Sequence, residues 1–337
     1  MCGDPTLSCS GGKRLSDSLT RRGFVTLIRC KFTFLFAMCA GVLAAADVNF
    51  NGRWDLLLTN PNADKAWWLE VSGAGTSELK GRFIGFPGGD LNAINELKIV
   101  SDELQFSFEN TAGRREYRAK WVNGQLQGQM TGPGGPVPFV GYRAPVIRDR
   151  DDAAWLKSEA IQLFNGKDLA GWTGFGNAND LGWTVADGVL KSAGKARNLV
   201  STKRFWNFEL HVEYKVAEHS NSGIGLRGRY EVQILDDFGN PAQSHGNGAL
   251  YSRLTPVVNA SKKAGEWQTM DVRLVGRDVS VTLNGKSLIA KQKIEGLTAI
   301  AIDPYEGLPG VIELQGDHGA VEFRSIVLTP LFRPTAQ

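Results

Sequence analysis

The chain has 337 residues, of which 42% are apolar and 22% charged, the composition of an ordinary globular protein with room for two domains. Its formal net charge of +3 comes from the first 46 residues, which hold six Lys and Arg against two Asp and Glu. The remainder carries 32 basic and 33 acidic residues, so its charge gives no argument for nucleic acid, and we expect no nucleic-acid partner.

Residues 1–46 have the pattern of a secretory leader. Basic residues precede the apolar run KFTFLFAMCAGVLAAA, which ends in small residues. The pattern predicts a signal peptide cleaved near Ala46 and a periplasmic or secreted protein, with surface association through Cys39 as an alternative. The apolar run is short for a membrane span, so we expect none in the mature chain. All cysteines lie in the leader (Cys2, Cys9, Cys30 and Cys39), so the mature chain would have no disulfide.

Residues 47–143 read as a small all-β domain. Short alternating segments follow one another with tight turns; in one of them Leu104, Phe106 and Phe108 share a face. Seven or eight sequential strands predict an up-and-down meander, closed or nearly closed, that is, a lipocalin-like barrel. Trp67 and Trp68 could mark a ligand-binding mouth or belong to the core.

Residues 144–160 break this pattern and predict a charged linker with a helical turn or two. Residues 161–332 are again rich in strands. The segment FELHVEYKV alternates apolar and polar side chains, and Asn284-Gly285 indicates a hairpin turn. About a dozen strands without a long amphipathic helix predict two packed antiparallel sheets, a sandwich or jelly roll.

One strand in this second region has an unusual polar face. From Arg227 onward, alternate positions carry Arg227, Arg229, Glu231 and Gln233, while Tyr230, Val232 and Ile234 occupy the positions between. The period of two predicts a half-buried strand. A merely wetted strand would more often carry Lys, Thr and Ser, so this face suits a binding groove.

The second region resembles a known family. The segments LFNGKDLAGWTG, WTVADGVLKS, FELHVEYKV, NSGIGLRG, YEVQILD, GALY, AGEWQTMDVRLVGRDVSVTLNGK and LQGDHGAVEFRSI occur in its order. The match runs from Ile161 to Leu328 and resembles the 3-keto-disaccharide hydrolase family, also described as a 3-keto-glucoside lyase/hydratase domain. The resemblance implies a concanavalin A-like jelly roll, export, and action on an oxidised sugar substrate with a ketone at C3.

The resemblance also implies a mechanism. A ketone at C3 makes the C2 proton acidic, so a base can remove it, the C1 substituent can leave by β-elimination, and water can add back to give net hydrolysis. These steps need a base near C2, a cation or hydrogen-bond donor at the C3 oxygen, and an acid at the leaving group. In some members a divalent metal is thought to hold the keto sugar.

Residues of this sequence can be matched to those roles. We expect the catalytic groups to be Glu231, His318 and Asp236. We expect the substrate-binding groups to be Asn221, Arg227, Gln233, Tyr251, Gln315 and Trp267. No compact ligand spacing supports a metal site, and its candidate ligands would be Glu231, His219 and His245.

Two other functions remain open at this point. The same fold hosts non-catalytic, lectin-like carbohydrate-binding proteins, because a fold does not fix a function. An ordinary glycosidase is disfavoured, since Glu231-Val-Gln233 lacks the middle carboxylate of the E-x-D-x-x-E motif of jelly-roll glucanases. The density of ionisable groups between Asn221 and Tyr251 favours an enzyme.

Overall fold

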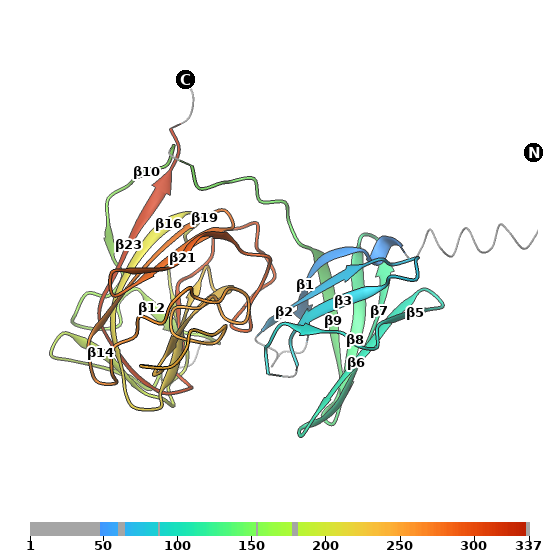
Figure 1. Cartoon of the computed structure of the whole chain (residues 1–337), viewed down its shortest axis with the longest axis horizontal. Coiled ribbons are helices and arrows are strands. Elements are labelled where there is room, and N and C mark those ends of the chain that lie inside the picture. The colour runs from blue at the N-terminus through green and yellow to red at the C-terminus, as the bar shows by residue number, and fades with distance from the viewer. Residues whose placement is uncertain (1–47, 60–64, 87, 153, 177–180, 335–337) are drawn as a thin grey trace, which may run out of the picture. The chain divides into compact units, whose positions relative to one another are not determined.

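Nearly all of the regular secondary structure in the described residues is β-strand (Figure 1). The computed structural model describes residues 48–59, 65–86, 88–152, 154–176 and 181–334. Within these ranges the one helical element is the 3-10 turn η1 (Val48–Phe50), and no helix is both long and apolar enough to cross a membrane. The predicted leader and its cleavage site lie outside the described residues.

The N-terminal sheet is a meander of nine strands in the order β4-β3-β2-β1-β9-β8-β7-β6-β5. The first and last long strands, β1 and β9, pair with each other, as in a barrel. The sheet order ends at β4 and β5, so the predicted barrel-like meander is open between these two strands. The strands are β1 (Gly52–Leu58), β2 (Ala66–Ser72), β3 (Lys80–Ile84), β4 (Asn92–Ala93), β5 (Lys98–Val100), β6 (Glu103–Asn110), β7 (Gly113–Val122), β8 (Gln125–Gly132) and β9 (Gly135–Arg143).

Aromatic side chains fill the inside of this meander. Leu104 and Phe106 on β6 are buried, as their alternation predicts, and Phe106 stacks on Tyr117 of β7 with ring centroids 4.6 Å apart. Trp67 packs edge-on against Phe83 and Tyr117. The two neighbouring tryptophans therefore pack in different cores. Trp67 belongs to the core of the meander, and Trp68 packs into the core of the second region.

Two antiparallel sheets form the second region, as the predicted sandwich requires. The larger has the order β13-β14-β23-β16-β19-β20-β21, with β10 and β11 also paired to β23, and the smaller has the order β12-β15-β22-β17-β18. Their strands are β10 (Leu156–Lys157), β11 (Ile161–Gln162), β12 (Trp172–Gly174), β13 (Trp183–Ala186), β14 (Val189–Ala193), β15 (Leu199–Ser201), β16 (Phe208–Val216), β17 (Asn221–Leu226), β18 (Tyr230–Leu235), β19 (Gln268–Val275), β20 (Asp278–Leu283), β21 (Lys286–Lys293), β22 (Glu313–Leu314) and β23 (Ala320–Phe332).

The core of the sandwich follows from the alternating pattern. In β16, Leu210, Val212 and Tyr214 are at most 1% exposed, while the residues between them are half-buried. Asn284 and Gly285 join β20 to β21 with φ values of 50° and 78°, the left-handed backbone that an Asn-Gly hairpin turn supplies at low cost. The predicted hairpin is confirmed.

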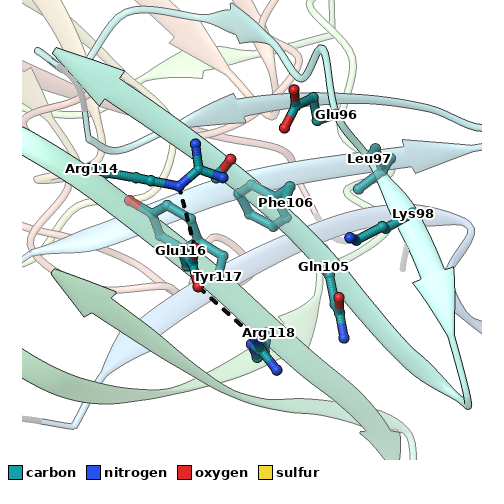
Figure 2. Close-up of a pocket in the computed structure, with 10 residues that line it drawn as sticks. Glu96, Leu97, Lys98, Gln105, Phe106, Arg114, Glu116, Tyr117 and Arg118 are labelled. Carbon is teal, nitrogen blue, oxygen red and sulfur yellow. Dashed lines mark hydrogen bonds and ion pairs between the residues drawn. The ribbon is translucent and has the colours of Figure 1, made fainter.

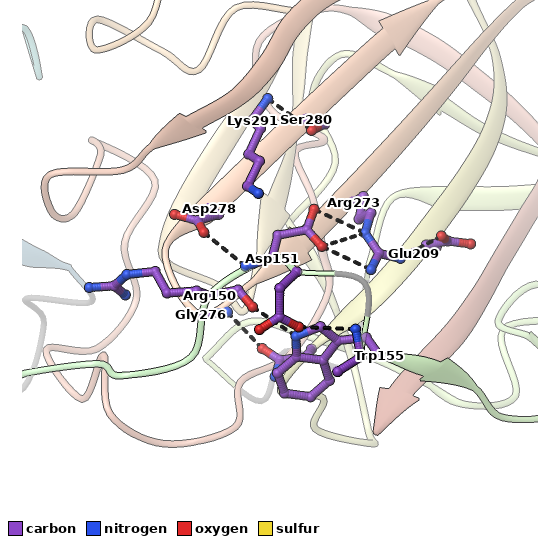
Figure 3. Close-up of polar contacts among 12 residues, drawn as sticks. Arg150, Asp151, Trp155, Glu209, Arg273, Gly276, Asp278, Ser280 and Lys291 are labelled. Carbon is purple, nitrogen blue, oxygen red and sulfur yellow. Dashed lines mark hydrogen bonds and ion pairs between the residues drawn. The ribbon is translucent and has the colours of Figure 1, made fainter. Parts of the chain in front are cut away.

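The segment between the two regions is held against the larger sheet (Figure 3). The Arg273 guanidinium donates to the Asp151 carboxylate at 2.9 Å and to Glu209 at 2.7 Å, and the Asp151 amide donates to Asp278 at 2.9 Å. The predicted helical turn is wrong for the described part of residues 144–160: Leu156 and Lys157 instead pair with β23 as β10.

Candidate functional site

The polar face of the smaller sheet carries two parallel rows of side chains. Strand β17 lies between β18 and β22, and its Gly225 pairs with Glu231 on one side and with Glu313 on the other. One step along, Gly223 pairs with Gln233, and the Gln315 amide donates to its carbonyl at 3.0 Å. The intervening residues of these strands, such as Ile224 and Val232, point into the sandwich core, so both rows face away from it.

The two glycines leave room for the carboxyl side chains that lie on this face. A Cβ on Gly223 would lie 2.5 Å from Oε1 of Glu231, and a Cβ on Gly225 would lie 2.9 Å from the Cβ of Glu313. Any larger residue at either position would displace a carboxyl side chain. The glycines therefore form a floor on which the two carboxyl side chains lie.

Both carboxyl groups are removed from water. Glu231 is 4% exposed and Glu313 1% exposed. Burial raises the pKa of Glu231 to about 7. Burial also raises the pKa of Glu313 to about 8; the neighbouring Glu231 adds to this shift and a hydrogen bond from Asn198 opposes it. Near neutral pH the pair can hold one proton and one negative charge, which is the arrangement that acid–base chemistry needs.

Several buried oxygen atoms on this face have no hydrogen-bond donor within the described part of the chain. They are Oδ1 of Asn221, Oε1 of Gln233, Oε1 of Gln315 and Oε2 of Glu313. Buried polar atoms in proteins are nearly always paired, and an exception points to a missing ligand or water. The three amide oxygens in this set are acceptors only, which fits a ligand rich in O–H donors.

Loops at the two sides of the sheet add further polar groups. Beyond β22, the Asp317 carboxylate contacts Nδ1 of His318 at 2.6 Å and raises the pKa of that imidazole. Beside β18, the Tyr251 amide donates to the Glu231 carbonyl at 3.0 Å. The Tyr251 ring lies 4.6 Å from that of His245. The structure thus brings Glu231, Gln233, Asn221, Gln315, His318 and Tyr251 to one face.

The structure gives Asp236 and His219 a turn role. The Asp236 carboxylate accepts a hydrogen bond from the His219 amide at 2.9 Å, and His219 is exposed with φ 59°. Asp236 lies one position out of phase with Glu231 and Gln233 and follows the end of β18. Neither residue joins the rows of the polar face.

Arg227 and Trp267 lie elsewhere. The polar alternation does not extend back to Arg227, because β18 begins at Tyr230 and Arg227 lies in the turn before it. Its buried guanidinium donates to the carbonyls of Trp206 and Gly276 and to the Asn207 side chain. The Trp267 ring faces Lys215 of β16 and Arg324 of β23, both in the larger sheet. We therefore leave both residues out of the candidate site.

The described residues do not fit a protein-bound metal. They contain no group of three or more His, Cys, Asp or Glu side chains placed to share an ion. Of the predicted ligands, His245 is instead paired with Asp90 at 2.7 Å. We therefore derive no chemical step through a metal.

Sequence reasoning missed Glu313 and Asn198. The Asn198 amide donates to Glu313 at 2.9 Å, and its own oxygen accepts from the Gly316 amide at 3.0 Å, which fixes the second carboxyl group. A signal for Glu313 existed. Glu313-Leu-Gln315 repeats the pattern of Glu231-Val-Gln233, and the period of two places each Glu and Gln on one face.

A second groove, of about 390 Å³, lies in the N-terminal meander beside β5, β6 and β7 (Figure 2). Its charged side chains face one another: Glu116 contacts Arg114 at 3.3 Å and Arg118 at 3.8 Å. None of the residues predicted to act on substrate lines this groove. The glycine-floored face of the smaller sheet is therefore the stronger candidate site.

The two packed antiparallel sheets define a jelly-roll domain. The paired buried carboxyl groups on the outer face of the smaller sheet define a candidate acid–base site in it. The chain belongs to the family described as the 3-keto-alpha-glucoside-1,2-lyase-like domain, whose model matches residues 159–329. The predicted resemblance, placed at residues 161–328, is confirmed.

The chain is also similar to a named relative and to solved structures. A 3-keto-disaccharide hydrolase of Bacteroides thetaiotaomicron is 29% identical over 143 residues, covering 32% of this chain and 49% of its own. The chain thus spans about half the length of that relative. Two Parabacteroides distasonis structures, named provisionally as glycosyl hydrolases, are 30% and 29% identical. They cover 55% and 51% of this chain and 90% and 98% of their own, with TM-scores of 0.45 and 0.42.

Proposed function

We propose that the protein cleaves 3-keto-glycosides such as 3-keto-disaccharides, by net hydrolysis through elimination and rehydration. The observation that carries the proposal is the row Glu231–Gly225–Glu313. It sets two buried carboxyl groups, with pKa values of about 7 and about 8, on either side of a glycine. The family and the name of the Bacteroides relative supply the substrate class.

Glu231 is the general base in this proposal. Burial raises its pKa to about 7, so near neutral pH a share of Glu231 is ionised and can accept a proton. The carboxylate removes the proton from C2 of the sugar, and the C2–H electron pair forms an enolate with the C3 carbonyl. A base with a pKa near the working pH is the most effective for such a transfer.

Glu313 is the general acid. When the enolate re-forms the C3 carbonyl, a double bond forms between C1 and C2 and the C1–O bond breaks. The leaving oxygen takes the proton of Glu313, which is still held near neutral pH because its pKa is about 8. Water then adds its oxygen to C1 and a proton returns to C2, so the sum of the steps is hydrolysis with no oxidant or reductant consumed.

The remaining polar groups hold the substrate. The unpaired oxygens of Asn221, Gln233 and Gln315 accept hydrogen bonds from sugar hydroxyls. His318, whose pKa is raised by Asp317, supplies a further ionisable group near the carboxyl pair.

The test is incubation of the purified protein with 3-keto-sucrose and with sucrose in parallel, with and without EDTA, in D₂O. We expect cleavage of the keto sugar alone and solvent deuterium at C2 of the product. Binding of both sugars without turnover would instead indicate a lectin-like protein. Cleavage without C2 deuterium would refute the elimination mechanism.

We also propose that the protein is exported. The support is the leader pattern of residues 1–46 in the sequence. N-terminal sequencing of protein recovered outside the cytoplasm should give a start near Asp47, and a start before Arg21 would contradict the proposal.

A further inference from the structure

The N-terminal meander, which lies outside the family match, contacts the border of the candidate site at three points. The Ala66 amide donates to the Ala301 carbonyl at 2.8 Å. The Leu91 amide donates to Oγ of Ser252 at 2.8 Å. The carboxylate of Asp90 pairs with His245 at 2.7 Å. Two strand ends of the meander therefore lie against the sandwich.

One of the sandwich segments at these contacts also contacts the backbone of the row Glu231–Gly225–Glu313. Thr298, three residues before Ala301, accepts a hydrogen bond from the Glu231 amide through Oγ1 at 2.8 Å. The Ile300 side chain lies 3.5 Å from the position of a Cβ on Gly225, in the floor. Ala66 is thus anchored to a segment that touches both Glu231 and the glycine floor.

Lys65 directly precedes Ala66, is exposed, and makes no ion pair within the described part of the chain. Its positive charge lowers the pKa values of Glu231 and Glu313, although burial outweighs this effect in both. It also lowers the pKa values of Asp317 and His318. Lys65 therefore lies within electrostatic range of both carboxyl groups of the row, on the segment that the Ala66–Ala301 hydrogen bond holds beside it.

We propose that Lys65 of the N-terminal meander completes the site by donating a hydrogen bond to the C3 oxygen of the substrate. This inference rests on the proposed function. Removing the C2 proton moves negative charge onto that oxygen, and a cation there lowers the barrier to enolate formation. Arg227 cannot take this role, because its guanidinium is committed to the turn before β18.

The experiment compares Lys65→Met and Lys65→Arg with the full-length wild-type protein on 3-keto-sucrose in D₂O. Lys65→Met should slow both turnover and C2 exchange by about 100-fold, the scale for losing one donor to a developing oxyanion. Lys65→Arg should restore part of the rate, because it keeps the charge. The matched control is Lys80→Met, which removes an exposed lysine of β3 that pairs with Glu78.

The pH profile separates a catalytic role from a structural one. The charged groups around Glu231 are Lys65, Glu313, Asp317 and His318, and the Tyr251 phenol lies beside them. Without Lys65 the pKa of Glu231 rises, so the acid limb of kcat/KM should move to higher pH in Lys65→Met and stay in place in Lys80→Met.

The two ideas fail in different ways. If wild type cleaves the keto sugar and Lys65→Met keeps both its C2 exchange rate and its acid limb, the role of Lys65 is refuted and the proposed function stands. If wild type neither cleaves 3-keto-glycosides nor exchanges C2, the proposed function is refuted and the role of Lys65 falls with it.

Discussion

Gly223 lies directly beneath the carboxyl group of Glu231, on the neighbouring strand. The distance of 2.5 Å from an added Cβ to Oε1 is shorter than any real Cβ contact. Gly223 pairs with Gln233 rather than with Glu231, so the glutamate side chain runs diagonally across β17. The position of the proposed base therefore depends on a residue that has no side chain of its own.

Gly223→Ala should lower turnover of a 3-keto-glycoside by about 10- to 100-fold, because the methyl group pushes the base away from C2. The thermal midpoint should fall by only a few degrees, since the atom in contact is the end of a flexible side chain that can rotate away. Gly134→Ala is the control, because a Cβ there meets nothing within 4 Å. Equal activity in the two variants would show that the position of Glu231 does not matter.

Glu231→Gln should reduce turnover by about 100-fold or more and abolish deuterium entry at C2, because the amide cannot accept the proton. Substrate binding should change much less, since Asn221, Gln233 and Gln315 remain. Glu218→Gln, in an exposed turn, is the control. Steady-state kinetics together with isothermal titration of an unreactive keto sugar check both statements.

The pH profile of kcat/KM should be bell-shaped, with limbs near pH 7 and pH 8 set by the two carboxyl groups. Glu313→Gln should lower the rate and remove the alkaline limb, because no proton is left to lose there, while the acid limb stays with Glu231. A profile of unchanged shape in this variant would rule out Glu313 as the acid.

Stability should fall as the pH rises from about 5 to about 8. The folded-state pKa values of Glu231 and Glu313 lie above the ordinary value of 4.5, so in this window the folded protein holds more protons than the unfolded chain. The stabilisation from these two groups is complete below their ordinary pKa of 4.5, and it is lost as the pH rises through their raised pKa values. Thermal melts of the Glu231→Gln, Glu313→Gln double variant should show a flatter dependence over this window.

Arg227→Lys should destabilise the protein by about 2–4 kcal/mol, because a lysine cannot satisfy two carbonyls and an amide oxygen at once. The Arg227 guanidinium also lies 3.8 Å from the centre of the Trp206 ring, a stacking contact that lysine does not reproduce. Urea denaturation measures the loss. Below the melting transition, kcat/KM of the variant should stay close to that of the wild type. A specific loss of substrate affinity would instead show that Arg227 binds the substrate.

The pattern of the sequence predicted the layers of the fold because each layer depends on local alternation. The buried face of β16 and the turn at Asn284 are visible in single segments. The opening between β4 and β5 was not predictable in this way, since it depends on which strands pair across the meander. The helical turn predicted within residues 144–160 was wrong for the same reason, because Leu156 forms a strand only by pairing with Phe332 of β23.

The site was half predictable. Glu231 and Gln233 were found from their own strand, and the same rule applied to β22 would have found Glu313. The rule failed at Arg227, because alternation says nothing about where a strand begins, and the positive φ at that residue ends the pattern. Asn198 and Lys65 carry no local signal. They approach the site only when distant segments fold together.

The floor of the site repeats the same pair of side chains on the two sides of β17. A Glu and a Gln lie on the β18 side, and a Glu and a Gln lie on the β22 side. The two sides therefore offer the same chemical groups and differ in their borders. Tyr251 and His245 lie beside β18, and His318 lies beyond β22. Exchanging the residues at those two borders, with the floor unchanged, should reverse the orientation in which this site binds a glycoside.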